Sequence, residues 1–195
     1  MAYQLSDRLN AHHGTIHCLA FDNHGHFLCS GGDDQRAIIW SMDTKSQFQE
    51  FYNRDWGAIR CVRWLGEDDV GRKTLGIGCE SGVLNVYRQN RHGGKFSPLC
   101  SINLDTGSVE SMAFDRPGNC LAVGGEAGDI SMYKLQEGEG SLSHLWTTQL
   151  PASTNQEGDI ICDLLFCHDL YSLDKESGTV KVGVPMHPFP PTNDM

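Results

Sequence analysis

The chain has 195 residues, of which 39% are hydrophobic and 22 are glycine, and these values are typical of a globular protein rich in turns. Its formal net charge is −10, and residues 67–69 form its one dense acidic cluster. Because such a chain is poorly suited to hold a phosphate backbone, we expect no direct contact with nucleic acid.

The amino terminus lacks the apolar stretch of a secretion signal, since residues 1–8 read MAYQLSDR. We therefore expect an intracellular protein, cytoplasmic or nuclear, without a membrane partner. In that reducing compartment the eight cysteines are expected to remain free thiols. Cys18 and Cys61 occupy the same place in two successive copies of a repeated pattern, which suits small buried thiols that line a core.

The first copy of that pattern covers residues 11–41 and contains three short apolar runs separated by turns rich in glycine and aspartate. The runs predict strands at residues 15–21, 26–31 and 36–41, and a fourth strand is expected at 46–52. Together these strands indicate an antiparallel meander.

The meander recurs along the chain. Three apolar anchors mark its first strand in each copy: Ile16, Leu19 and Phe21; Ile59, Val62 and Trp64; Val109, Met112 and Phe114; and Ile161, Leu164 and Phe166. The expected strands are 58–64, 73–78, 83–88 and 97–103 in the second copy, and 108–114, 120–124, 129–134 and 143–150 in the third. In the fourth copy, 160–166 and 178–184 are expected to be strands, while the stretch around 170–173 lacks the usual glycine turn. Such repetition predicts units that bury their apolar faces only against one another.

The first copy also carries four polar or aromatic residues at fixed places: before the first strand, in the second strand, in the next turn and at the end of the third strand. They are His12, Ser30, Asp34 and Trp40. In this pattern the chain resembles the WD-repeat β-propeller family, strongly over residues 11–41. The resemblance implies that the four side chains form one hydrogen-bonded relay, because a buried polar group left unpaired costs roughly 1–3 kcal/mol.

The later copies depart from the relay at every member. The residues at the four places are Asp55, Ile77, Ser81 and Tyr87 in the second copy, and Asp105, Val123, Ala127 and Tyr133 in the third. Since all members change together, no half-satisfied network remains, and we expect apolar packing to replace it.

The repeats and the resemblance predict an all-β fold of β-propeller blades, each a four-stranded antiparallel meander, with about four blades over residues 1–184. Residues 185–195 are rich in proline and are expected to form an extended tail. Two arrangements stay open. Residues 2–9 could complete a fourth blade and close a small ring, or the blades could form an open arc, which blades shaped for larger rings favour. The free edges of an arc would promote self-association.

The resemblance also implies a function, since propellers of this kind bind segments of other proteins on one face. We therefore expect a non-catalytic interaction scaffold. Two columns of residues are predicted to contact partners: His17, Arg60 and Glu110 after the first anchor, and Asp33, Glu80 and Glu126 in the turn after the second strand. The second column is acidic in every copy. Two interpretations stay open: acidic residues are common in exposed turns for local reasons, or their charge selects Lys/Arg-rich segments.

Catalytic, cofactor and metal sites are not expected. Cys162, Cys167 and His168 lack the spacing and the second ligand pair of a zinc site. Residues 76–82 are rich in glycine but precede a predicted strand, whereas a dinucleotide site needs a helix there. Two alternatives stay open: a propeller enzyme of the lactonase or quinoprotein type, which needs inward carboxylates around a metal or cofactor, and a truncated fragment without independent function.

Overall fold

A computed structural model describes residues 7–90, 93–104, 107–136, 138–149, 164, 172–173 and 180–181. The chain divides into two compact units, residues 1–164 and residues 165–195, and each is considered by itself.

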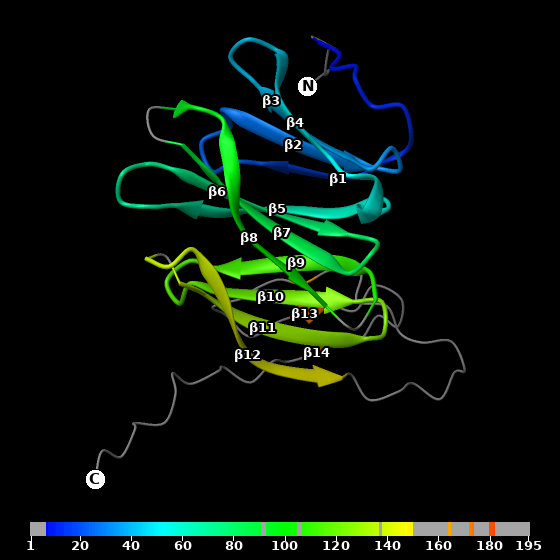
Figure 1. Cartoon of the computed structure of the whole chain (residues 1–195), viewed down its shortest axis with the longest axis vertical. Helices are drawn as coiled ribbons and strands as arrows, with labels where there is room; N and C mark the ends of the chain where they lie inside the picture. Colours follow the sequence, from blue (N-terminus) through cyan, green and yellow to red (C-terminus); the bar gives the residue numbers. More distant parts are fainter. Residues whose placement is uncertain are drawn as a thin grey trace. The chain divides into compact units, whose positions relative to one another are not determined.

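The first unit contains three four-stranded antiparallel sheets, here named blades 1 to 3, in which each strand pairs with the next one in sequence (Figure 1). Blade 1 consists of β1 (Ile16–Phe21), β2 (Phe27–Gly32), β3 (Arg36–Ser41) and β4 (Ser46–Tyr52). Blade 2 follows the short 3-10 helix η1 (Arg54–Trp56) and consists of β5 (Ile59–Glu67), β6 (Lys73–Cys79), β7 (Val83–Gln89) and β8 (Phe96–Asn103). Blade 3 consists of β9 (Val109–Asp115), β10 (Cys120–Gly125), β11 (Asp129–Gln136) and β12 (Ser141–Gln149). The all-β fold of four-stranded meanders is thus confirmed.

The largest difference from the predicted strand bounds is at the end of β5, which continues to Glu67. Glu67 pairs in register with Lys73 of β6 and makes an ion pair with it. The Lys73 ammonium also lies 2.7 Å from the Asp22 carboxylate of blade 1. This contact between blades holds the extended end of the ladder, and the local sequence of β5 contains no sign of it.

The core lies between successive blades, because β5 contacts both β1 and β9. One cluster of buried apolar side chains joins blades 1 and 2, and a second joins blades 2 and 3. Blade 2 is therefore covered on both sheet faces, and every residue of β6 is buried. Within the described residues the blades form an open series, in which no sheet covers the face of blade 1 that points away from blade 2.

The expected fourth blade falls mostly outside the described residues, as do residues 160–163, residues 165–166 and the proline-rich stretch 185–195. In the second unit the described residues form one short antiparallel pair, β13 (Ser172–Leu173) with β14 (Val180–Lys181). The strand expected at 178–184 includes β14. At the amino terminus, residues 7–9 form no strand, so this part of the strand-like reading of residues 2–9 was wrong. No described strand lies beside them to complete a ladder.

Candidate partner-binding face

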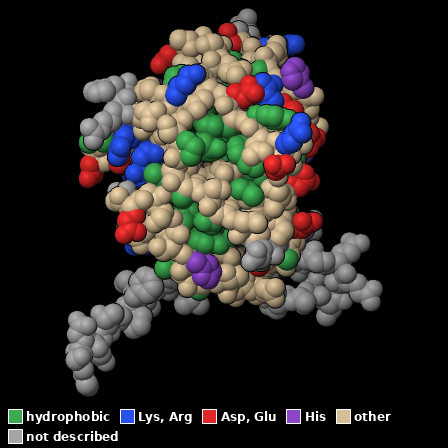
Figure 2. Space-filling view, in the orientation of Figure 1, with side chains coloured by type: hydrophobic (Ala, Val, Ile, Leu, Met, Phe, Trp, Pro, Cys, Tyr) green, Lys and Arg blue, Asp and Glu red, His purple; other side chains and the backbone are tan. Residues whose placement is uncertain are grey.

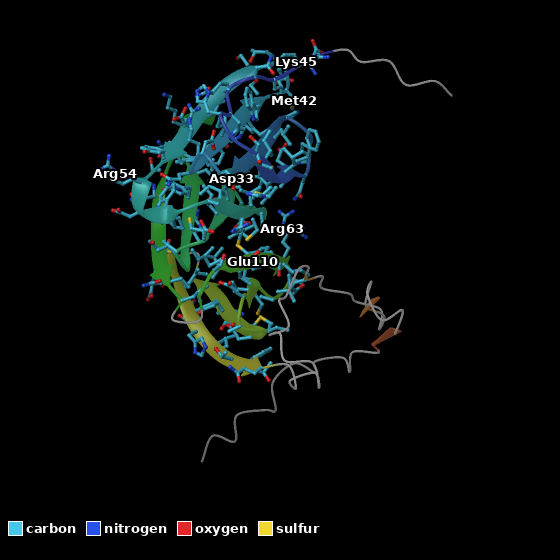
Figure 3. All side chains as sticks on the ribbon, turned by 90° about the vertical axis from the view of Figure 1, so that its right-hand side faces the viewer. Asp33, Met42, Lys45, Arg54, Arg63 and Glu110 are labelled. Atoms are coloured by element: carbon cyan, nitrogen blue, oxygen red, sulfur yellow. The ribbon has the colours of Figure 1, made fainter. Side chains whose placement is uncertain are left out.

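The starts of the first strands and the turns between the second and third strands lie at one end of the blades. The antiparallel registers place them there, since Ile16 pairs with Gly32, Ile59 with Cys79, and Val109 with Gly125. This end is on the right in Figure 1 and faces the viewer in Figure 3, where Asp33 and Glu110 are labelled. We name it the turn face.

Four side chains of blade 1 are hydrogen-bonded in series beside the turn face. The indole N–H of Trp40 donates to Ser30 Oγ at 2.9 Å, and Ser30 Oγ lies 2.7 Å from His12 Nε2. The other ring nitrogen, Nδ1, lies 2.9 Å from Asp34 Oδ2. This row joins the segment before β1 to three strands and turns of the blade.

Asp34 is the end of this row and accepts further hydrogen bonds from the backbone. Its carboxylate accepts the His13 N–H at 2.9 Å and the Arg36 N–H at 3.3 Å. Burial opposes ionisation of Asp34, but the hydrogen bonds from the His13 N–H and the His12 ring hold the pKa of its carboxyl below the usual value.

The order Asp34, His12, Ser30 has the connectivity of a hydrolase triad, so the access to Ser30 decides its chemistry. Ser30 is 2% exposed, and its oxygen already accepts the Trp40 N–H. A substrate carbonyl cannot reach this hydroxyl. The row therefore stabilises the blade and offers no accessible nucleophile.

At the places equivalent to Ser30 and Trp40, the other two blades carry apolar and aromatic side chains. Ile77 and Tyr87 are buried in the cluster between blades 1 and 2, and Val123 and Tyr133 in the cluster between blades 2 and 3. Trp56 of η1 is also buried in the first of these clusters. Trp56 was not predicted as a core residue, although its place directly after Asp55, which stands at the His12 position of the relay, is a usable signal in the sequence.

The two columns of predicted contact residues lie beside one another on the turn face, where they form pairs within blades 1 and 2. In blade 1, His17 Nε2 contacts Asp33 Oδ1, and this contact lowers the pKa of the Asp33 carboxyl. In blade 2, Arg60 Nη2 donates to Glu80 Oε1 at 2.7 Å. The Ala58 N–H and Arg60 together lower the pKa of the Glu80 carboxyl.

Blade 3 differs, because Glu110 stands where blades 1 and 2 place His17 and Arg60. Its partner in the second column is the exposed Glu126, so the pair has two like charges. The nearest cation that the structure gives for Glu110 is Arg60, whose Nε lies 4.0 Å from Glu110 Oε1. Arg60 is already bonded to Glu80. In Figure 2 acidic side chains gather along the right-hand edge, which is the turn face.

A small cavity of about 150 Å³ lies at the opposite end of blades 2 and 3. It is lined by side chains of both charges, among them Asp68, Arg88 and Arg116. Its volume is below the roughly 300–1,000 Å³ of typical small-molecule sites, so it gives no support to a cofactor or substrate pocket.

Other titratable groups lie elsewhere in the described part of the chain. No group of three or more His, Cys, Asp or Glu side chains there could hold a metal ion. Burial raises the pKa of Cys18 to about 12, which keeps this thiol protonated and unreactive. Cys162, Cys167 and His168 lie outside the described residues. Among the described helices, none has the length and apolar character needed to span a membrane.

Comparison with known proteins agrees with this architecture. Residues 3–41 match the family model "WD domain, G-beta repeat". Protein hir1 of Emericella nidulans is 28% identical over 146 residues, which cover 68% of this chain and 14% of the relative. Protein HIR1 of Aspergillus oryzae is 27% identical over 142 residues, covering 68% and 13%. The U3 small nucleolar RNA-associated protein 18 homolog of Arabidopsis thaliana is 26% identical over 111 residues, covering 56% and 20%.

The chain thus spans only 13–20% of the length of these relatives. The matched residues include β1, β2 and β3 of blade 1 and end before β4, and blades 2 and 3 repeat the four-stranded order of blade 1. Residues 3–41 therefore match a WD repeat, and the resemblance of this chain to the WD-repeat β-propeller family is confirmed.

Proposed function

We propose that the chain is a non-catalytic interaction scaffold whose turn face binds Lys/Arg-rich segments of partner proteins. The proposal treats residues 1–184 as one partial propeller and residues 185–195 as its tail. One observation carries it: blade 3 has Glu110 and Glu126 at the two positions where blades 1 and 2 have the pairs His17–Asp33 and Arg60–Glu80.

Comparison of the three blades indicates that Glu110 and Glu126 require a positively charged partner. His17 offsets Asp33 and Arg60 offsets Glu80. For Glu110 the structure gives one cation contact, at 4.0 Å to the Nε of the same Arg60. A Lys or Arg side chain from a partner, placed between Glu110 and Glu126, would complete the third pair. Positively charged segments are therefore the partners that this face favours.

The magnitude of such contacts sets the expected strength of binding. Exposed ion pairs contribute only about 0–1 kcal/mol each, so one basic side chain is not sufficient. A segment with several basic residues can reach the Glu110 and Glu126 pair and also Glu80 and Asp33 along the same face. Its binding should weaken with salt, because the Debye length falls from about 10 Å at 0.1 M to about 3 Å at 1 M.

An enzymatic function receives no support from the geometry. The Asp34, His12 and Ser30 row is inaccessible to substrate, as Ser30 is 2% exposed. The relatives named above include a U3 small nucleolar RNA-associated protein 18 homolog. We place the scaffold inside the cell, in the nucleus or the cytoplasm.

A peptide array tests the proposal directly. Lys/Arg-rich, Asp/Glu-rich and neutral peptides of equal length are probed with the wild-type chain and with Glu110→Gln/Glu126→Gln. The matched control is Asp43→Asn/Asp69→Asn, which removes the same charge from two exposed turn positions away from the turn face. We expect selective capture of the basic peptides, reduced by the first variant and unchanged in the control. Equal capture by both variants would place the binding surface elsewhere.

A further inference from the structure

The guanidinium of Arg60 lies among carboxylates of all three blades on the turn face. Its Nη2 donates to Glu80 Oε1 of its own blade at 2.7 Å, and its Nε lies 4.0 Å from Glu110 Oε1 of blade 3. The hydrogen bond to Glu80 is the largest of the effects that raise the pKa of Arg60, and the charges of Glu110 and of Asp33 in blade 1 act in the same direction. Arg60 is therefore a cation that the acidic residues of this face already hold.

Arg60 is held by few contacts for a side chain in this position. A guanidinium carries several N–H donors, and among the described residues its side chain donates to Glu80 Oε1. The Nε–H is buried and donates to no acceptor there, because the 4.0 Å to Glu110 exceeds hydrogen-bond distance. The side chains of Arg60 and Glu80 are 31% and 48% exposed, so water screens their attraction. Opening this pair therefore requires little free energy.

The carboxylate of this pair is fixed independently of Arg60. The Ala58 N–H donates to Glu80 Oε2 at 3.0 Å, and this hydrogen bond is the largest of the effects that lower the pKa of the Glu80 carboxyl. Glu80 also packs against Gly57, where a Cβ atom would lie 2.8 Å from Glu80 Oε2. The backbone thus keeps the carboxylate ionised and in place, and Oε1 remains an acceptor when Arg60 moves away.

We propose that Arg60 is an internal competitor that a partner segment displaces from Glu80. The inference rests on the proposed function: a Lys or Arg of the bound segment takes the hydrogen bond to Glu80 Oε1, and the Arg60 side chain turns outward to water. This exchange replaces one exposed ion pair by another, so the partner gains only from contacts beyond Glu80. Arg60 thereby rejects segments with a single basic residue and selects those that also reach Glu110 and Glu126.

The affinity for a Lys-rich peptide, measured by isothermal titration calorimetry, tests the competition. Arg60→Gln removes the competitor and leaves Glu80 anchored, so we expect the Kd to fall about two- to fivefold, as the loss of one exposed ion pair allows. The matched control is Arg63→Gln, which removes the same charge from the same strand at a position in register with Gly76. It should change the Kd by less.

The outcomes separate this inference from the proposed function. A wild-type chain that binds the peptide, with an unchanged Kd in Arg60→Gln, contradicts the competition and leaves the proposed function in place. Equal tightening by Arg60→Gln and Arg63→Gln would show an effect of net charge alone and also contradicts the competition. If neither the wild type nor the variants bind the peptide, both proposals are wrong. Binding by Arg60→Gln where the wild type does not bind supports the competition.

The Arg60 side chain itself gives a readout in the wild-type chain. Its Nε–H is buried in the free chain, so this proton should exchange slowly with water. NMR of the isotopically labelled chain follows the Nε–H signal, assigned by its loss in Arg60→Gln, as the unlabelled Lys-rich peptide is added. Displacement exposes the Nε–H, and we expect its exchange to become faster in the complex. Exchange that stays unchanged or becomes slower overturns the proposal, whatever the folding of the variants.

Discussion

At the residue scale, the carboxylate of Asp34 holds several groups of the first blade together. It contacts the His12 ring and accepts the backbone N–H groups of His13 and Arg36. Asp34→Ala leaves these donors without their acceptor, and we expect the free energy of unfolding to fall by about 1–3 kcal/mol. Urea denaturation at neutral pH measures this loss against Asp43→Ala, an exposed turn carboxylate. A loss no larger than that of the control would contradict the assigned role.

The pH dependence of the same variant is a separate prediction. The pKa of Asp34 is lowered in the folded state, so its ionised form binds the folded chain's donors and favours folding. That contribution is fully present above the unfolded pKa of about 3.9 and is lost as the pH falls through the lower folded pKa. The difference in unfolding free energy between wild type and Asp34→Ala should therefore shrink in acid. A difference that stays constant across this range would show that the charge of Asp34 is not responsible.

At the element scale, the junctions between blades depend on close approach of whole strands. Gly31→Ala would force a Cβ atom to within 2.4 Å of Ile59 Cγ2, so blades 1 and 2 must move apart. We expect a loss of about 1–3 kcal/mol, which is typical of an overpacked core. Gly138→Ala is the matched control, since a Cβ atom there meets nothing within 4 Å. Thermal or urea unfolding compares the two, and equal stabilities would mean that the junction tolerates a side chain.

The strands were predictable from sequence because each has an alternating or continuous apolar pattern bounded by glycine and aspartate turns. The pairing of His17 with Asp33 and of Arg60 with Glu80 was not, because it depends on the register between two strands. A β-bulge shifts that register near the start of β1 and again near the start of β5. The contact of Lys73 with Asp22 was missed for a similar reason, as its members belong to different blades. Local pattern thus predicts elements, and tertiary packing decides which charges meet.

At the scale of the whole molecule, the charges of the first unit are arranged by the repeat. Successive blades bring equivalent positions to one end. The residue at one position changes from His17 to Arg60 to Glu110, so blades 1 and 2 have a cationic or imidazole side chain beside the acid of the second column, whereas blade 3 has a second acid. The sequence predicted both columns. It could not show that Asp33 and Glu80 each have a partner within their own blade, which leaves blade 3 with two acids at the equivalent positions. The proposed selection of basic segments depends on that distinction.

Hydrogen exchange of the chain with and without a basic peptide selected on the array tests this account most directly. Binding on the turn face should slow exchange in the β10–β11 turn around Glu126 and in the segment leading into β9. The β3–β4 turn around Asp43, at the other end of blade 1, should be unaffected. Protection confined to the turn face, and lost in Glu110→Gln/Glu126→Gln, is the result predicted. Protection at the opposite end, or protection that persists in this variant, would contradict the claim that blade 3 selects the partner.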